Sequence, residues 1–135
     1  MSISKWKIYD YVDENGKNEI ESWCRSLQKS DLGRLNRKLQ MLEENGPNLG
    51  PKLLAGPIKG YPHLRKLCVR GNVQLRPLLC KGPIDNEQEF TLLKGAFEVG
   101  YEYSPAGALA DADIRRQEVI RNAPTRRCPH VKVVK

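Results

Sequence analysis

Apolar and polar positions follow two different periods in the first part of the chain. Residues 5–11 alternate between apolar and polar side chains, which predicts a first β-strand. Over residues 18–28 the apolar positions recur three and four apart, as on one stripe of a helix. Asn18 can cap this helix, and Glu21 can complete a capping box. The apolar stripe consists of Ile20, Trp23, Cys24 and Leu27.

A second helix is predicted over residues 30–44. Its apolar stripe also has helical spacing and consists of Leu32, Leu35, Leu39 and Leu42. Ser30 or Asp31 can cap its N-terminus, and Gly46-Pro47 ends it. Because two or three residues separate the two helices, we expect a helical hairpin.

The second half of the chain is predicted to hold strands followed by one helix. A connector rich in glycine and proline occupies residues 46–63. Three segments of strand length, rich in Leu, Val and Phe, follow at 64–70, 73–81 and 89–97. Ser104 followed by Pro105 predicts the start of a third helix that ends at about residue 121. Residues 122–135 show no periodicity, and we expect them to be a basic tail.

The resulting order, β-α-α-β-β-β-α, predicts one α+β domain over residues 1–121. Short links between successive strands require antiparallel pairing. We expect the helices to cover one face of this antiparallel sheet and to leave the other face partly open. A chain of 135 residues has the size of one ordinary domain, and 39% hydrophobic with 29% charged residues is typical of a globular protein.

Positive charge is concentrated in one segment, residues 61–83. The formal net charge of +7 favours nucleic acid, an acidic protein or an anionic membrane as a partner. The segment contains no Asp or Glu, and its cations are Arg65, Lys66, Arg70, Arg76 and Lys81. Because an unopposed group of cations on a hairpin suits a polyanion, we expect the functional site there.

The predicted turn of this hairpin, at Gly71-Asn72, leaves two registers open. A two-residue loop places Arg76 on the face opposite to Lys66 and Arg70. A three-residue loop with a bulge shifts the register by one residue, so that all three cations share one face. The local sequence does not choose between them.

Membrane and metal chemistry are not indicated. No apolar run reaches the roughly 18–20 residues of a membrane span, and the first 16 residues lack the apolar centre of a signal peptide, so we expect a cytoplasmic protein. The four cysteines are then expected to be thiols. Cys128 and His130 are too few for a zinc site, which needs about four ligands, and we expect no metal and no cofactor.

Several short motifs, in a fixed order along the chain, carry a family resemblance. They are NEIESWCRSL, LNRKLQMLEENGP, LRKLCV, LRPLL, TLLKG and the SP before the last helix. Together they resemble the RelE superfamily of toxins, and in particular its phage-derived, HigB-like branch. Members of this family enter the ribosomal A site and cleave mRNA there, and an antitoxin encoded beside them neutralises them. The resemblance implies a RelE-like fold, a type II toxin that inhibits translation, and mRNA, the ribosome and a helix-turn-helix antitoxin as partners.

The resemblance also assigns roles to particular residues. Family members act as metal-free ribonucleases: the RNA 2′-hydroxyl attacks the adjacent phosphate, cations stabilise the transition state, and a group of suitable pKa moves protons. The catalytic residues expected from this match are Arg76, Lys66, Arg70 and Lys94. The RNA-binding residues expected are Arg65, Lys81, Tyr101, Tyr103 and His63, of which the tyrosines can stack on bases and the histidine can act as acid or base.

Two departures from the family pattern define the alternatives. Cys68 stands where the hairpin usually has an arginine, and Glu98-Val99 stands where two lysines usually follow the last strand. These departures favour a catalytically degenerate RelE-like module, of phage or mobile-element origin, that binds RNA or protein. They also fit a third hypothesis, in which the basic face binds an acidic protein as an inhibitor or adaptor.

Overall fold

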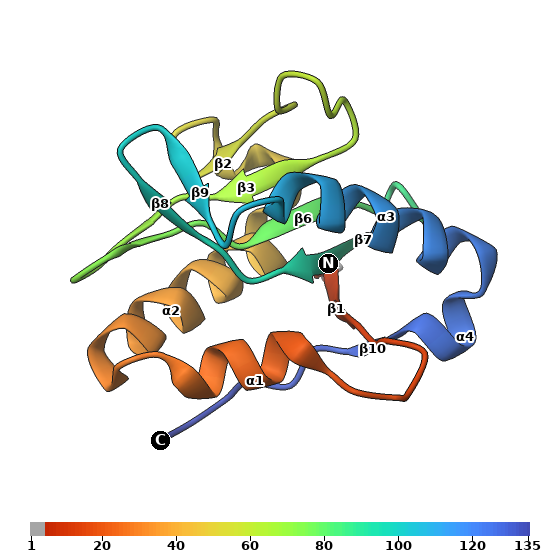
Figure 1. Ribbon diagram of the computed structural model, residues 1–135, viewed down its shortest axis with the longest axis horizontal. Helices are drawn as coiled ribbons and strands as arrows, with labels where there is room; N and C mark the ends of the chain where they lie inside the picture. The colour runs from red at the N-terminus through yellow and green to blue at the C-terminus, as the bar shows by residue number, and fades with distance from the viewer. Residues whose placement is uncertain (1–4) are drawn as a thin grey trace, which may run out of the picture.

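The computed structural model describes residues 5–135, and residues 1–4 of the expected domain lie outside the described part (Figure 1). Its helices are α1 (Glu19–Ser26), α2 (Lys29–Asn45), the 3-10 helix η1 (Gly46–Leu49), α3 (Ala108–Arg121) and α4 (Ala123–Arg126). Its strands are β1 (Lys7–Tyr11), β2 (Leu54–Ala55), β3 (Arg65–Leu67), β4 (Val69–Arg70), β5 (Gln74–Leu75), β6 (Leu78–Lys81), β7 (Glu89–Lys94), β8 (Phe97–Val99), β9 (Glu102–Ser104) and β10 (Arg127–Pro129).

The strands form two sheets, and the protein has an α+β fold as predicted. The larger sheet has the order β10-β1-β7-β6-β3-β2, and the smaller one has the order β4-β5-β8-β9. The antiparallel pairing predicted for the last three strands is confirmed by the β3–β6 and β6–β7 pairs. β1 lies parallel to β7, which is possible because both α1 and α2 and the hairpin lie between them in the chain.

Helices cover both faces of the larger sheet, so the expectation of one covered face is wrong. α1 and α2 pack on one face, and α3 packs on the other (Figure 1). The physical reason is visible along β7, where Phe90 and Leu92 belong to the first core and Leu93 belongs to the second. A strand that is apolar on both sides must be covered on both sides.

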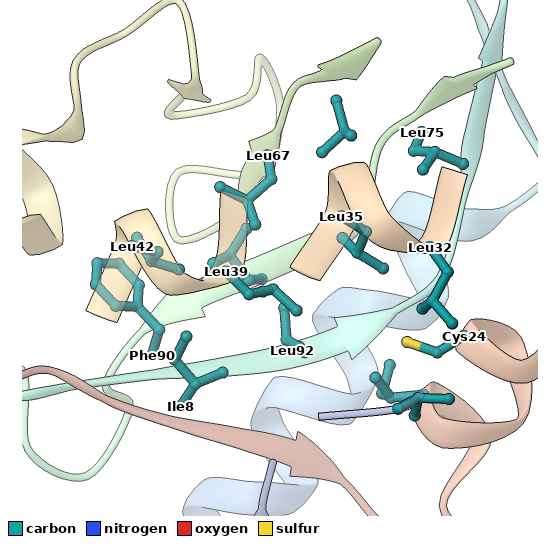
Figure 2. Close-up of a cluster of buried hydrophobic side chains, with 14 of the residues drawn as sticks. Ile8, Cys24, Leu32, Leu35, Leu39, Leu42, Leu67, Leu75, Phe90 and Leu92 are labelled. Carbon is teal, nitrogen blue, oxygen red and sulfur yellow. The ribbon is translucent and has the colours of Figure 1, made fainter. Parts of the chain in front are cut away.

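The leucine stripe of α2 forms the centre of the first core, as the sequence predicts. All four leucines are buried, and they belong to one cluster with Leu67, Phe90 and Leu92 of the sheet and Cys24 of α1 (Figure 2). The second core is smaller and consists of Tyr11, Leu64, Leu78, Cys80, Leu93, Ala96, Ala108, Ala112 and Val119. Small alanines on α3 let this helix lie close to the sheet.

The predicted helix caps are only partly correct. The side chain of Asn18 caps α1 by accepting the backbone N–H of Glu21 at 2.9 Å, as predicted. The Glu21 carboxylate does not complete a capping box, because it pairs with Arg25 one turn later. α2 begins at Lys29, and neither Ser30 nor Asp31 caps it.

The last 14 residues are not a tail, which corrects the expectation for 122–135. Residues 123–126 form α4, and β10 pairs antiparallel with β1 at the edge of the larger sheet. Val133 is buried in the first core, and His130 contacts the buried carboxylate of Asp10 with Nδ1 2.8 Å from Oδ1. The segment lacks periodicity because one short strand and single anchoring residues hold it, and such contacts leave no repeating pattern.

The strand predicted over 89–97 is divided by a bend at Gly95-Ala96. β7 ends at Lys94, and β8 continues in the smaller sheet, where it pairs with β5 and with β9. A Cβ atom on Gly95 would overlap the indole ring of Trp23, so only glycine permits this close approach. β9 takes up Ser104, and α3 therefore begins later than predicted, at Ala108.

We expect Gly95→Ala to destabilise the protein by about 1–3 kcal/mol, because the added methyl group overpacks the contact with Trp23. Chemical denaturation followed by circular dichroism measures this free energy of unfolding. Gly33→Ala is the matched control: the space around Gly33 in α2 is open, and the same change in a helix should stabilise by about 0.5–1 kcal/mol. A Gly95→Ala variant as stable as the wild type would contradict the steric argument.

We expect His130→Ala to cost about 3 kcal/mol of stability, because it removes a partner from the buried carboxylate of Asp10. Lys132→Ala, an exposed residue of the same segment, should change stability by less than about 0.5 kcal/mol. Equal stability of the two variants in thermal or urea unfolding would mean that the C-terminal segment does not depend on this contact.

Candidate functional site

The hairpin turn is docked on the start of α2. The backbone N–H of Asn72 donates to the buried Asp31 carboxylate at 2.9 Å, and the Asn72 side-chain amide donates to Gln28 at 2.8 Å. A Cβ atom on Gly71 would overlap Oδ1 of Asp31, so the turn needs glycine at this position. Asp31, expected as a helix cap, instead fixes the hairpin to the helix.

This docking accompanies the three-residue register. Arg70 pairs with Gln74, Val69 pairs with Leu75, and the loop between them is residues 71–73. The same register continues into the larger sheet, where Lys66 pairs with Leu78. The three-residue alternative is therefore confirmed, and it places Lys66, Arg70 and Arg76 on the α3 side of the hairpin.

A carboxylate lies between two of these cations. Oε1 of Glu98 is 3.1 Å from Nζ of Lys66 and 3.0 Å from Nε of Arg76. The three side chains come from β3, from the residue after β5 and from β8, so the bend at Gly95 is what brings Glu98 to the hairpin. The side chains of Lys66 and Glu98 are each 22% exposed, and that of Arg76 is 12% exposed. We call Lys66, Arg76 and Glu98 the triad.

Arg76 is held by the backbone as well as by Glu98. Its Nη1 donates to the carbonyl oxygen of Leu75 at 2.8 Å and to that of Val69 at 3.4 Å, and its Nη2 donates to the side chain of Gln74 at 3.0 Å. Every nitrogen of the guanidinium thus has a partner. Arg76 is a fixed positive charge that orients Glu98, whereas the Lys66 ammonium has three donors and only part of them are used.

The charges of the triad shift the pKa values of its members. Burial disfavours the charged form of Lys66, yet its contacts with Tyr103 and Glu98 more than offset this and raise its pKa. Burial likewise acts to raise the pKa of Glu98, but Lys66 and Arg76 outweigh it and hold this pKa below the usual range. Glu98 is therefore ionised near neutral pH, and the triad carries one net positive charge.

Lys94 reaches the same face of the sheet through a β-bulge. The β6–β7 register shifts between Leu78 and Leu79, so that Leu78 pairs with Lys94 while Leu79 pairs with Leu92. A bulge re-aims the side chain that follows it. As a result Lys94 points to α3, where its Nζ is 3.6 Å from the Asp111 carboxylate.

The other expected site residues are spread over the molecule. Arg65 pairs with Leu79, and Lys81 lies over the ring of Trp6 at 5.9 Å, so both belong to the α1–α2 side of the sheet, opposite to Lys66. Arg70 and His63 are exposed, Arg70 at the end of the short β4 and His63 in the loop before β3. Tyr101 is fully exposed at the turn between β8 and β9.

Tyr103 joins the triad to a shallow groove. Nζ of Lys66 lies 5.2 Å from the centre of the Tyr103 ring. The groove has a volume of about 410 Å³, and its walls include Tyr61, Tyr103 and Leu109. Glu102 and the residues that begin α3 complete its lining. Tyr103 thus contacts the Lys66 ammonium and also lines the groove.

Sequence reasoning placed Glu98 near the hairpin as a departure from a family pattern, but it missed that this carboxylate would bridge two cations. It also missed Tyr61 and Asp111. The signal available was indirect: a lone glutamate between apolar residues on a strand needs a polar partner, and the only charged side chains of the hairpin are cations.

Comparison with family models, with curated proteins and with solved structures finds no match for this chain. Within residues 5–135 there is no group of three or more His, Cys, Asp or Glu side chains placed to hold a metal ion. The helices described for the same residues include none with the length and apolar character that crossing a bilayer requires. The case for function therefore depends on the triad and its surroundings.

We expect Glu98→Gln to cost about 1–2 kcal/mol of stability at pH 7, because it weakens charge-assisted hydrogen bonds that solvent partly screens. A carboxyl whose pKa is lowered by folding contributes stability above its unfolded pKa, about 4.3, and loses it as the pH falls through its folded pKa. The stability difference between wild type and variant should therefore be constant from about pH 6 to 9 and shrink below about pH 4.

Urea unfolding at a series of pH values measures this difference. Glu87→Gln, the same change on an exposed loop residue, is the control and should show no comparable loss at pH 7. If the difference in unfolding free energy between the wild type and Glu98→Gln stays constant from pH 3 to pH 7, the triad does not hold Glu98 in its ionised form.

Proposed function

We propose that this protein is a toxin of the RelE type: a metal-independent endoribonuclease that cleaves mRNA on the ribosome and inhibits translation. In this proposal a helix-turn-helix antitoxin, encoded beside it, neutralises the toxin, and the protein acts in the cytoplasm, where ribosomes are. The proposal combines the motif resemblance with the arrangement of charged and aromatic side chains on the α3 side of the sheet.

The single observation that carries the proposal is the convergence of expected catalytic cations on one face. Lys66, Arg76 and Lys94 come from three separate segments, and the three-residue turn and the bulge in β7 direct all of them to the α3 side. Cations gathered in a partly buried place stabilise the charge that develops on a phosphate during transesterification. Arg70 extends this face toward the hairpin tip, where it can contact a neighbouring phosphate.

The groove beside Tyr103 supports a single-stranded RNA as the substrate. Proteins recognise unstacked RNA by stacking its bases on aromatic side chains, and they hold the backbone with cations. Here Tyr61 and Tyr103 line a groove of about 410 Å³, and Lys66 lies against the Tyr103 ring. One nucleotide can place its base in this groove and its phosphate at Lys66. An mRNA codon exposed in the ribosomal A site is such a strand.

A catalytically degenerate RNA- or protein-binding module is the second candidate, and one observation favours it. Glu98 offsets one of the two triad cations, and Arg76 already donates from all of its nitrogens. In this alternative the triad stabilises the smaller sheet, and the exposed face only binds. The two candidates differ in one measurable property, the cleavage of RNA.

Induced expression of the wild type in a bacterial host should arrest growth, and purified protein added to a translating extract should produce cut mRNA at ribosomal A sites. Lys66→Ala should lower the cleavage rate by about 100-fold, the usual cost of losing one transition-state charge contact. Arg76→Ala should also lower this rate, because it removes a positive charge from the site and a partner from Glu98. Primer extension on a defined message, with and without ribosomes, measures the cut sites and their dependence on the ribosome.

Lys17→Ala is the matched control, because this exposed lysine lies in the loop before α1, away from the proposed site. It should arrest growth as the wild type does. Normal growth and intact mRNA with soluble wild-type protein present would overturn the toxin proposal. RNA binding retained under those conditions, with an affinity that falls as salt rises, would support the binding module instead.

A further inference from the structure

Glu98 is an acidic residue at the centre of a cationic site, and its position suits a chemical role. We propose that Glu98 is the general base of the cleavage reaction, which takes the proton from the 2′-hydroxyl of the RNA. This inference rests on the proposed function and adds a catalytic residue to it. The two cations of the triad then have different roles. Arg76 positions Glu98, and Lys66 contacts both Glu98 and the substrate phosphate.

The geometry leaves one carboxylate oxygen for the substrate. Both hydrogen bonds that Glu98 accepts from the triad use Oε1, and within residues 5–135 no hydrogen bond uses Oε2. Arg76 cannot follow a moving Glu98 without giving up the carbonyl oxygens of Leu75 and Val69. Lys66 and Arg76 thus hold Oε1 of Glu98 in place. Oε2 stays available as a proton acceptor.

The proposed step conserves protons and bonds. Oε2 of Glu98 takes the 2′-hydroxyl proton while O2′ bonds to phosphorus, and the bond from phosphorus to O5′ breaks. The products are a 2′,3′-cyclic phosphate and an O5′ that takes a proton from solvent. Lys66, with N–H donors not used by Glu98, stabilises the negative charge that develops on the non-bridging oxygens.

The surrounding charges keep Glu98 in the ionised form that a base needs at neutral pH, and they also lower its affinity for a proton. The groups that face it are Lys66 from β3, Arg76 after β5 and Tyr103, its direct pairing partner in β9. Gln74, which pairs with it across the strands, carries no charge. These cations keep Glu98 ionised in the free protein. When a phosphate binds at Lys66, its negative charge raises the proton affinity of Glu98, which improves the base once substrate is bound.

The test compares the wild type, Glu98→Gln, Glu98→Asp and the control Glu87→Gln in single-turnover cleavage on ribosomes, together with RNA affinity and a pH–rate profile. We expect Glu98→Gln to lower the cleavage rate at least 100-fold and to leave RNA affinity unchanged or a few-fold tighter, because a negative charge is removed. Glu98→Asp should keep part of the activity, and Glu87→Gln should match the wild type. The rising acidic limb of the wild-type profile should disappear in the residual activity of Glu98→Gln.

Each alternative gives a different result. Cleavage by Glu98→Gln at or above the wild-type rate would overturn the inference and identify Glu98 as a group that merely occupies the phosphate site. A loss of RNA affinity equal to the loss of cleavage would also overturn it, because the effect would then be structural. A wild type that does not cut RNA overturns the proposed function, and the inference with it, whereas a cutting wild type with an unimpaired Glu98→Gln overturns the inference alone.

Discussion

The buried carboxylate of Asp31 is the contact on which the arrangement of the basic face depends. A carboxylate that is almost fully removed from water needs hydrogen-bond donors, and the backbone N–H of Asn72 supplies one at 2.9 Å. This bond ties the tip of the hairpin to the first turn of α2. With the tip held there, the loop has three residues, and Lys66 and Arg76 share a face. A loop shorter by one residue would send Arg76 to the other side of the sheet.

The bend after β7 is the second constraint, and it acts through close packing. Gly95 lets the backbone approach Trp23, and the chain then leaves the larger sheet and enters the smaller one. Because of this change of sheet, Glu98 meets the hairpin and not the continuation of β7. The triad thus combines a loop fixed by a hydrogen bond with a strand redirected by a glycine. The docked turn and the Gly95 bend lie outside the triad, yet together they decide which charged side chains come into contact.

The triad also shows why a count of cations is a poor guide to a site. Five cations without an acidic residue in the segment 61–83 suggested an unopposed positive patch. In the fold two of these five, Arg65 and Lys81, lie on the opposite side of the sheet, and Lys66 and Arg76 share a carboxylate from a distant strand. The site is therefore less positive and more structured than its sequence segment. A carboxylate held between a fixed guanidinium and an ammonium with unused N–H donors is suited to proton transfer, whereas a bare cationic patch is suited only to binding.

Periodicity along the chain was enough to predict the local elements and much of the first core. The spacing of Leu32, Leu35, Leu39 and Leu42 predicts the buried side of α2, because helical periodicity is a local property. It also indicated the α+β class, the basic hairpin and two possible registers. The register, the second covered face, the strand formed by the last residues and the place of Glu98 became known only from the folded arrangement. Each of these depends on a contact between residues far apart in the chain, such as Asp31 with Asn72 or His130 with Asp10. A single sequence carries no periodic signal for such contacts, because they form only when the sheet and helices bring those residues together.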